Sequence, residues 1–461
     1  MRAGFVFVAA ALFAPCAPFA QALAQDGAGV PQDWTIELVA RSSVNSAIPA
    51  FRLPQGSSLS SQPVSIDELG GVAFRAVLSG NPSEGIFYGD PDAGGLIVTG
   101  NSADSLFSSS VDAFGGRVAV ADSFFSGNDL NVYDTSGVLV AAYPPGGTLG
   151  TSGPSSPTLS ADGAVCYEAD FGFVGDRLVV DEVIDGARVQ TAVADDFSGV
   201  YDFLLTPRMN AGRQIAINTI PSSGPSRRIV RFDPGAMGYE AVTIAETGPV
   251  YQSFVNSTGI GSDGSIAFTG QRNDTIREVV LAGADGSLTV IAEGGQSGIS
   301  NTNLANFPPV NNANGLAAFR VEDGSGSTAI YVGDGTDLVR IVGAGDLLET
   351  DLGPIAAGFN FGGLTGVQTI NSNIDINDGN QIAFGAFLEN GTIGIFIATP
   401  TSAACSGADL AAPFGTLDIF DVIAFLALFD GEDPGADLAA PAGVFDIFDV
   451  IEYLAVFDAG C

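Results

Sequence analysis

Short apolar runs separated by turns rich in glycine, asparagine and aspartate fill the chain from residue 34 to residue 400. Runs of this length, rich in Val, Ile and Phe and bounded by turn residues, predict β-strands. One pattern recurs, in which a small residue stands between two large apolar ones, as in Val72-Ala-Phe74. Its copies end at Phe74, Val120, Tyr167, Ile217, Phe268, Phe319 and Phe384.

Each of these seven copies belongs to a unit of about 50 residues that reads as four short strands. Four strands per unit at this period are typical of β-propeller blades, whereas an Ig-like sandwich unit needs about 100 residues. The seventh unit stops after its third strand, at residues 393–398, and residues 34–40 form a strand without a unit of its own. We therefore predict a mainly β, seven-bladed propeller over residues 34–400, closed by its N-terminal strand, which removes the exposed sheet edge of an open array.

The spacing Asn312-x-x-Gly315-x-x-Ala318-Phe319 resembles that of choice-of-anchor tandem-repeat proteins and, more distantly, TolB and WD-type propellers. The resemblance covers residues 34–400 and implies a fold without an active site. Asp263, Asn314 and Asp378 stand beside glycine in the predicted turns, and we interpret them as turn residues and not as ligands.

Composition limits the chemistry of the chain. The net charge is −36, from 52 acidic and 16 basic residues, and the basic residues are all arginine. A chain this acidic is repelled by the phosphate backbone, so we expect no nucleic-acid partner. Without histidine or lysine, the chain lacks imidazole bases, imidazole metal ligands and Schiff-base nucleophiles.

The N-terminus reads as a secretory signal peptide over residues 1–24, with Arg2 before an apolar stretch and the small residues Ala22 and Ala24 at its end. Residues 25–33 are expected to be a linker. No other segment is apolar enough to span a bilayer, so we expect a protein that is secreted or associated with the cell envelope.

Residues 401–461 form a second module with an internal duplication. Asp409, Asp418, Asp421, Phe425 and Phe429 recur as Asp437, Asp446, Asp449, Tyr453 and Phe457. Each half leads into an apolar helix, and in the first helix Val422, Phe425, Leu426 and Phe429 fall on one face. Cys405 and Cys461 bracket the module, and an exported compartment permits a disulfide between them.

Two loops that open with aspartate and lead into a helix resemble the halves of an EF-hand, and together they look like a dockerin of the GC type that ends many exported bacterial proteins. The resemblance implies that the module anchors or sorts the propeller through a cell-envelope protein. It also implies that the residues before each final loop aspartate contact the partner, namely Ile419, Phe420, Ile447 and Phe448. The other interpretation, slightly preferred, is that these four residues form the small core of the module.

The same resemblance implies Ca²⁺ ligands at Asp409, Asp418, Asp421, Asp437, Asp446 and Asp449. However, the third and fifth loop positions hold Ala411 and Pro413 in the first half and Ala439 and Pro441 in the second, which offer no side-chain oxygen. Calcium takes six to eight oxygens, so these aspartates either bind it weakly with carbonyl and water ligands or only cap helices and turns.

The expected function is a non-catalytic binding or scaffold protein anchored through the C-terminal module. One alternative is a propeller that hydrolyses glycans with paired carboxylates in its central channel, although no pair stands out in the sequence. Another is a calcium-dependent adhesion or surface-layer component.

Overall fold

The computed structural model describes two parts of the chain. The first is residues 30–401, except 44–47, 60–62, 101–110, 123–128, 151, 171–174, 237, 297–298, 300–303, 305–306, 323–326, 359–368 and 371. The second comprises residues 408, 410, 417, 419–431, 436, 438–439 and 444–459. The predicted signal peptide and both module cysteines lie outside these ranges.

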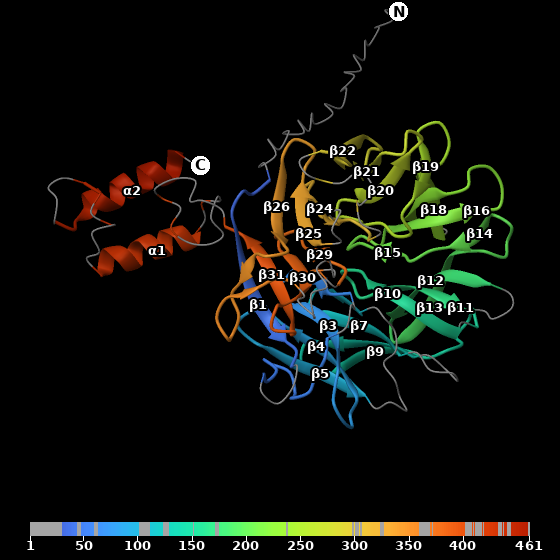
Figure 1. The fold of residues 1–461 in the computed structure, drawn as a ribbon, viewed down its shortest axis with the longest axis horizontal. Helices are drawn as coiled ribbons and strands as arrows, with labels where there is room; N and C mark the ends of the chain where they lie inside the picture. Colours follow the sequence, from blue (N-terminus) through green and yellow to red (C-terminus); the bar gives the residue numbers. More distant parts are fainter. Residues whose placement is uncertain are drawn as a thin grey trace, which may run out of the picture.

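Residues 34–400 form a seven-bladed β-propeller, as Figure 1 shows. Blade 1 contains β2 (Ser65–Ile66), β3 (Val72–Val77), β4 (Glu84–Gly89) and β5 (Gly94–Gly100). Blade 2 contains β6 (Val111–Phe114), β7 (Arg117–Asp122), β8 (Asp129–Asp134) and β9 (Leu139–Tyr143). Blade 3 contains β10 (Ser152–Leu159), β11 (Val165–Asp170), β12 (Asp176–Ile184) and β13 (Ala187–Asp195). Blade 4 contains β14 (Tyr201–Leu204), β15 (Arg208–Met209), β16 (Ile215–Pro221), β17 (Arg228–Gly235) and β18 (Gly238–Glu246). Blade 5 contains β19 (Tyr251–Phe254), β20 (Ile266–Arg272), β21 (Arg277–Ala282) and β22 (Leu288–Glu293).

Blade 6 contains β23 (Val310–Asn311), β24 (Ala317–Glu322), β25 (Thr328–Gly333) and β26 (Leu338–Gly343). A hairpin of β27 (Leu347–Leu348) and β28 (Ile355–Ala356) follows, and blade 7 contains β29 (Asp375–Ile376), β30 (Ile382–Phe387), β31 (Ile393–Pro400) and β1 (Trp34–Arg41). The hairpin lies in the longer interval that the sequence shows before the last motif copy.

The N-terminal strand closes the ring as predicted. β1 pairs antiparallel with β31, from Trp34 opposite Pro400 to Arg41 opposite Gly394. Val30, which the sequence placed in a linker, is 3% exposed and packs in the core between blades 6 and 7. The ordered packing of the propeller therefore begins before the closing strand.

The recurring motif has a simple packing role, because side chains alternate between the two faces of a strand. In blade 2, Val118 and Val120 pack against blade 1, whereas Ala119 packs against blade 3. The same division holds at the other blade interfaces, so a large side chain of one blade meets the small residue of its neighbour. Cys166 occupies the small position in blade 3, and its burial as a small hydrophobe is confirmed.

The hairpin between blades 6 and 7 is fastened to the closing strand by an ion pair. Arg41 is fully buried, and its Nε and Nη2 atoms donate hydrogen bonds to the two carboxylate oxygens of Asp351 at 2.8 and 2.9 Å. Asp351 lies between β27 and β28. The insertion therefore reinforces the seam at which the two ends of the propeller chain meet.

The C-terminal module contains α1 (Ile419–Asp430) and α2 (Ile447–Ala459). Phe425 and Tyr453, which are equivalent in the duplication, stack with ring centroids 4.0 Å apart, and the Tyr453 hydroxyl donates to the carbonyl of Ala408 at 3.1 Å. None of the helices in the described ranges combines the length and the apolar character needed to cross a bilayer.

Candidate functional sites in the channel and the C-terminal module

One residue position of each blade faces the axis of the propeller. It is the inner-strand residue opposite the small residue of the motif: Ser65, Asp112, Thr158, Arg208, Gly259, Val310 and Asp375. Five consecutive blades, from blade 7 through blade 4, supply polar side chains here, and blades 5 and 6 supply glycine and valine. At this position the polar side chains therefore come from one side of the ring only.

Two carboxylates, Asp112 and Asp375, share one hydroxyl in this polar half. Ser65 Oγ donates to Asp375 at 3.0 Å and lies 3.3 Å from an oxygen of Asp112. Each carboxylate also accepts a backbone N–H from the next blade, Asp375 from Ile66 at 3.1 Å and Asp112 from Leu159 at 2.7 Å. These bonds tie the inner strands of neighbouring blades together.

Arg208 is the cation of this cluster. Its Nη1 lies 3.6 Å from Asp112, which is an ion-pair distance but longer than a good hydrogen bond. The guanidinium also lowers the pKa of Asp375 through its charge, but burial has the larger effect and raises it. Burial likewise raises the pKa of Asp112 to about 7 despite Arg208. The cluster therefore contains two buried carboxyl groups and one cation, and burial favours the neutral form of both carboxyls.

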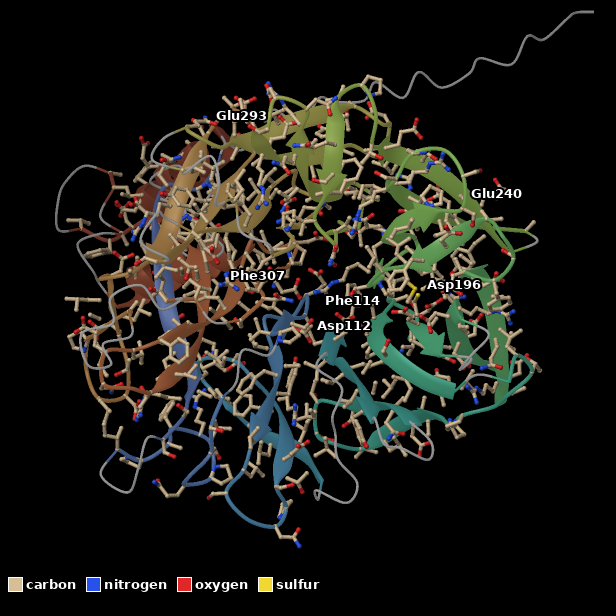
Figure 2. All side chains as sticks on the ribbon, turned by 45° about the vertical axis from the view of Figure 1, so that its right-hand side comes forward. Asp112, Phe114, Asp196, Glu240, Glu293 and Phe307 are labelled. Atoms are coloured by element: carbon tan, nitrogen blue, oxygen red, sulfur yellow. The ribbon has the colours of Figure 1, made fainter. Side chains whose placement is uncertain are left out.

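The channel contains two cavities, and Arg208 lines both of them. The first, of about 80 Å³, lies at the ends of the inner strands and is lined by Asp112, Asp375, Glu68 and Asp378, among others. The second, of about 170 Å³, lies at the starts of the inner strands and is lined mainly by prolines, serines and Asn373. Figure 2 shows Asp112 and Phe114 near the centre of the ring, whereas Glu240 and Glu293 lie toward its rim.

Two neighbouring carboxylates are thus present in the channel, although sequence reasoning did not find them. If the seven units are aligned on the inner-strand residue opposite the small motif residue, Asp112 and Asp375 occupy the same position. Sites for drug-sized ligands are clefts of about 300–1,000 Å³, so the cavity beside this pair is too small for a sugar chain.

The predicted turn residues hold loops in place. Asp263 accepts the backbone N–H and the hydroxyl of Ser265, at 2.9 and 2.6 Å. Asp378 reaches further, because it accepts the N–H of Ala313 at 2.8 Å and the hydroxyl of Ser262, which belong to blades 6 and 5. Both residues have structural partners, as the interpretation from sequence expected.

In the C-terminal module, Asp421 and Asp449 are buried and accept backbone N–H groups. Asp421 accepts from Leu410 at 2.8 Å, and Asp449 accepts from Leu438, Ala439 and Asp446 at 2.8, 2.7 and 2.9 Å. The hydrogen bonds from Ala439 and Asp446 hold the pKa of Asp449 below its usual range. Asp446 accepts the N–H of Phe448 and so caps the start of α2.

The described residues include only three of the six predicted calcium ligands, namely Asp421, Asp446 and Asp449. The carboxylate oxygens of Asp449 are already engaged by three amides, and no three Asp, Glu, Cys or His side chains of the described residues gather closely enough to hold a metal ion. Asp409, Asp418 and Asp437 lie outside the described residues. Calcium binding therefore stays a prediction from the resemblance.

We expect calcium to bind weakly at most, because it must compete with backbone amides for the same carboxylate oxygens. Millimolar CaCl₂ in place of EDTA should shift the thermal loss of helical circular dichroism in the full chain by no more than a degree or two. Asp449→Ala should lower that transition by several degrees under both conditions. A large calcium-dependent rise that Asp449→Ala abolishes would contradict this expectation.

Four residues directly precede the final loop aspartates, and those that the structure describes are not part of the core. Ile419, Ile447 and Phe448 are 63, 62 and 60% exposed, so the slightly preferred interpretation of these residues as core is wrong for all three. The side chain of Phe420 lies outside the described residues. Leu426, which the periodicity placed on the buried helix face, is also exposed, because Val422, Phe425 and Phe429 suffice to cover the neighbouring helix.

No family model matches the chain, and no curated protein matches it in sequence. Among solved structures, it is similar to TolB from Acinetobacter baumannii, at 13% identity over 55% of this chain and 58% of TolB, with a TM-score of 0.38. It is also similar to the β-propeller domain of the Trilobed protease from Pyrococcus furiosus, at 10% identity, 60% and 80% coverage and a TM-score of 0.41.

The polysaccharide lyase Uly1 is similar at 10% identity over 80% of this chain and 100% of that chain, with a TM-score of 0.41. The chain spans little more than half of TolB. At these identities and scores, the similarities concern the propeller architecture and carry no argument about activity.

Proposed function

We propose that this protein is an exported, non-catalytic binding or scaffold protein whose propeller is fixed at the cell envelope through its C-terminal module. The observation that carries the proposal is the exposure of Ile419, Ile447 and Phe448. The dockerin resemblance implies that these residues contact a partner, and large apolar side chains left in water at three such positions favour a docking role.

The channel supports a structural role for its charged groups. Asp112 and Asp375 bond to the backbone of neighbouring blades, and the adjacent cavity of about 80 Å³ has room for water or a small ion. A glycan hydrolase would need space for a sugar between the two carboxyl groups. A structural role for the two carboxylates is therefore better supported than catalysis in the channel.

Removal of residues 401–461 tests the anchoring role. We expect the shortened propeller to fold, because its seven inter-blade cores contain no residue of the module, and to move from the envelope fraction to the medium. Cell fractionation with immunoblotting measures this change, and the unaltered far-ultraviolet circular dichroism of the propeller serves as the control. An unchanged location would refute the anchoring role.

A further inference from the structure

The two helices of the C-terminal module each carry a second apolar face that the module does not bury. On α1 this face consists of Ile419, Ile423 and Leu426, which are 63, 55 and 48% exposed. On α2 the equivalent residues Ile447, Ile451 and Leu454 are 62, 54 and 47% exposed. We call these six residues the outer stripes.

The outer stripes have the spacing of a docking surface. Residues at i, i+4 and i+7 lie along one side of a helix, so each stripe forms a continuous ridge and not a set of isolated side chains. The inner face, with Phe425 and Tyr453 at its centre, is already satisfied by packing between the helices. Nothing in the described part of the module therefore requires the stripes to be apolar, and both halves of the duplication carry them.

The charge of the module restricts what can cover the stripes. Every charged side chain between residues 401 and 461 is acidic, and the exposed Glu452 directly follows Ile451 of the α2 stripe. A second copy would bring two chains of net charge −36 together, and an anionic lipid surface would repel the module in the same way. A surface of opposite charge both attracts such a module and excludes acidic competitors.

We infer that the outer stripes dock into an apolar groove of a protein partner whose rim carries lysine and arginine. This inference rests on the proposed anchoring function and names the chemistry of the partner. The apolar ridges supply the buried contact, and the acidic charge of the module, with Glu452 beside the α2 stripe, sets the preference for a basic rim and the rate of encounter.

A pair of defined probes tests the inference with the purified full chain. One is a fluorescent helical peptide with leucine on one face and lysine on the other, and the second replaces each lysine with glutamate. We expect the lysine peptide to bind, with an affinity that falls as salt rises, and the glutamate peptide not to bind. Ile423→Gln with Ile451→Gln should weaken binding of the lysine peptide at least tenfold.

The matched control is Leu347→Gln with Leu352→Gln, which changes two leucines of the propeller hairpin that are 69 and 51% exposed. This variant should bind the lysine peptide like the unaltered chain. Circular dichroism verifies that the helices persist in the stripe variant, since glutamine is a good helix former.

Four results would overturn the inference. These are equal binding of both peptides, full binding by the stripe variant, binding of the chain to vesicles of phosphatidylcholine and phosphatidylserine, and a stripe-dependent dimer in light scattering. If one of them occurs while removal of residues 401–461 still releases the protein from the envelope, the partner chemistry is wrong and the anchoring function stands.

Discussion

Asp351→Asn is expected to lower the free energy of unfolding of the propeller by about 3 kcal/mol, the lower end of the range for breaking a buried ion pair. Arg41 is fully buried and depends on both carboxylate oxygens of Asp351. An asparagine keeps the shape of the side chain but leaves the guanidinium charge without a counter-ion. Urea unfolding followed by the fluorescence of Trp34, the single tryptophan, reports directly on the closing strand.

The control for this measurement is Asp346→Asn, which changes the ion pair of Arg340 and Asp346 in the segment just before the same hairpin. That pair also spans 2.8 Å, but both side chains are more than one-third exposed, so its loss should cost less than about 1 kcal/mol. Replacing both partners of the ion pair, as Arg41→Met with Asp351→Leu, should recover most of the loss. Equal effects of Asp351→Asn and Asp346→Asn would show that the seam does not depend on the buried charge.

The free energy of unfolding should fall as pH rises from 5 to 8. The pKa of Asp112 is raised to about 7 in the folded protein, so between its ordinary value of 3.8 and 7 the folded state binds more protons than the unfolded state. The contribution of this group to stability is therefore full below its ordinary pKa and is lost as the pH rises toward about 7. The limiting loss for this one group is on the order of 4 kcal/mol. Burial raises the pKa values of Asp375 and Glu68 as well, which adds to the loss.

Asp112→Asn isolates the contribution of this residue, because asparagine cannot ionise and still offers an oxygen to the N–H of Leu159. We expect the variant to lose less stability between pH 5 and pH 8 than the unaltered chain in urea titrations. Asp285→Asn is the matched control, since hydrogen bonds from Ser287 lower the pKa of that exposed carboxyl and its titration ends well below pH 5. A pH slope unaffected by Asp112→Asn would disprove the role of the buried carboxyl.

The propeller could be predicted from sequence because its signal is repeated. The motif occurs seven times, and the strand of residues 34–40 was the one predicted strand without a blade. Its pairing with β31 could therefore be predicted. The channel could not be predicted in the same way. Inner strands such as β2 and β29 contain only two residues, and the position that faces the axis holds a different residue type in nearly every blade. Asp112 and Asp375 are recognised as equivalent only when the pairing of each inner strand with the motif strand is known.

The helices of the C-terminal module were predicted, but their buried face was only partly identified. Apolar residues surround α1 on more than one side, so periodicity alone placed Leu426 beside Val422 and Phe425. Which residues are buried is decided by the stacking of Phe425 on Tyr453, and that contact depends on the packing of two separate halves. The exposure of Ile419 and Ile447 follows from this packing and from no local signal.

The closing blade also sets the order of events during biosynthesis. Trp34–Arg41 is among the first propeller segments to leave the ribosome, yet its partner strand Ile393–Pro400 is made last. The first strand must therefore stay unpaired until synthesis of the propeller is nearly complete. Its pairing is also expected to be slow, because the two strands are far apart in the sequence. Until then, both ends of the nascent sheet array are open to association with other chains.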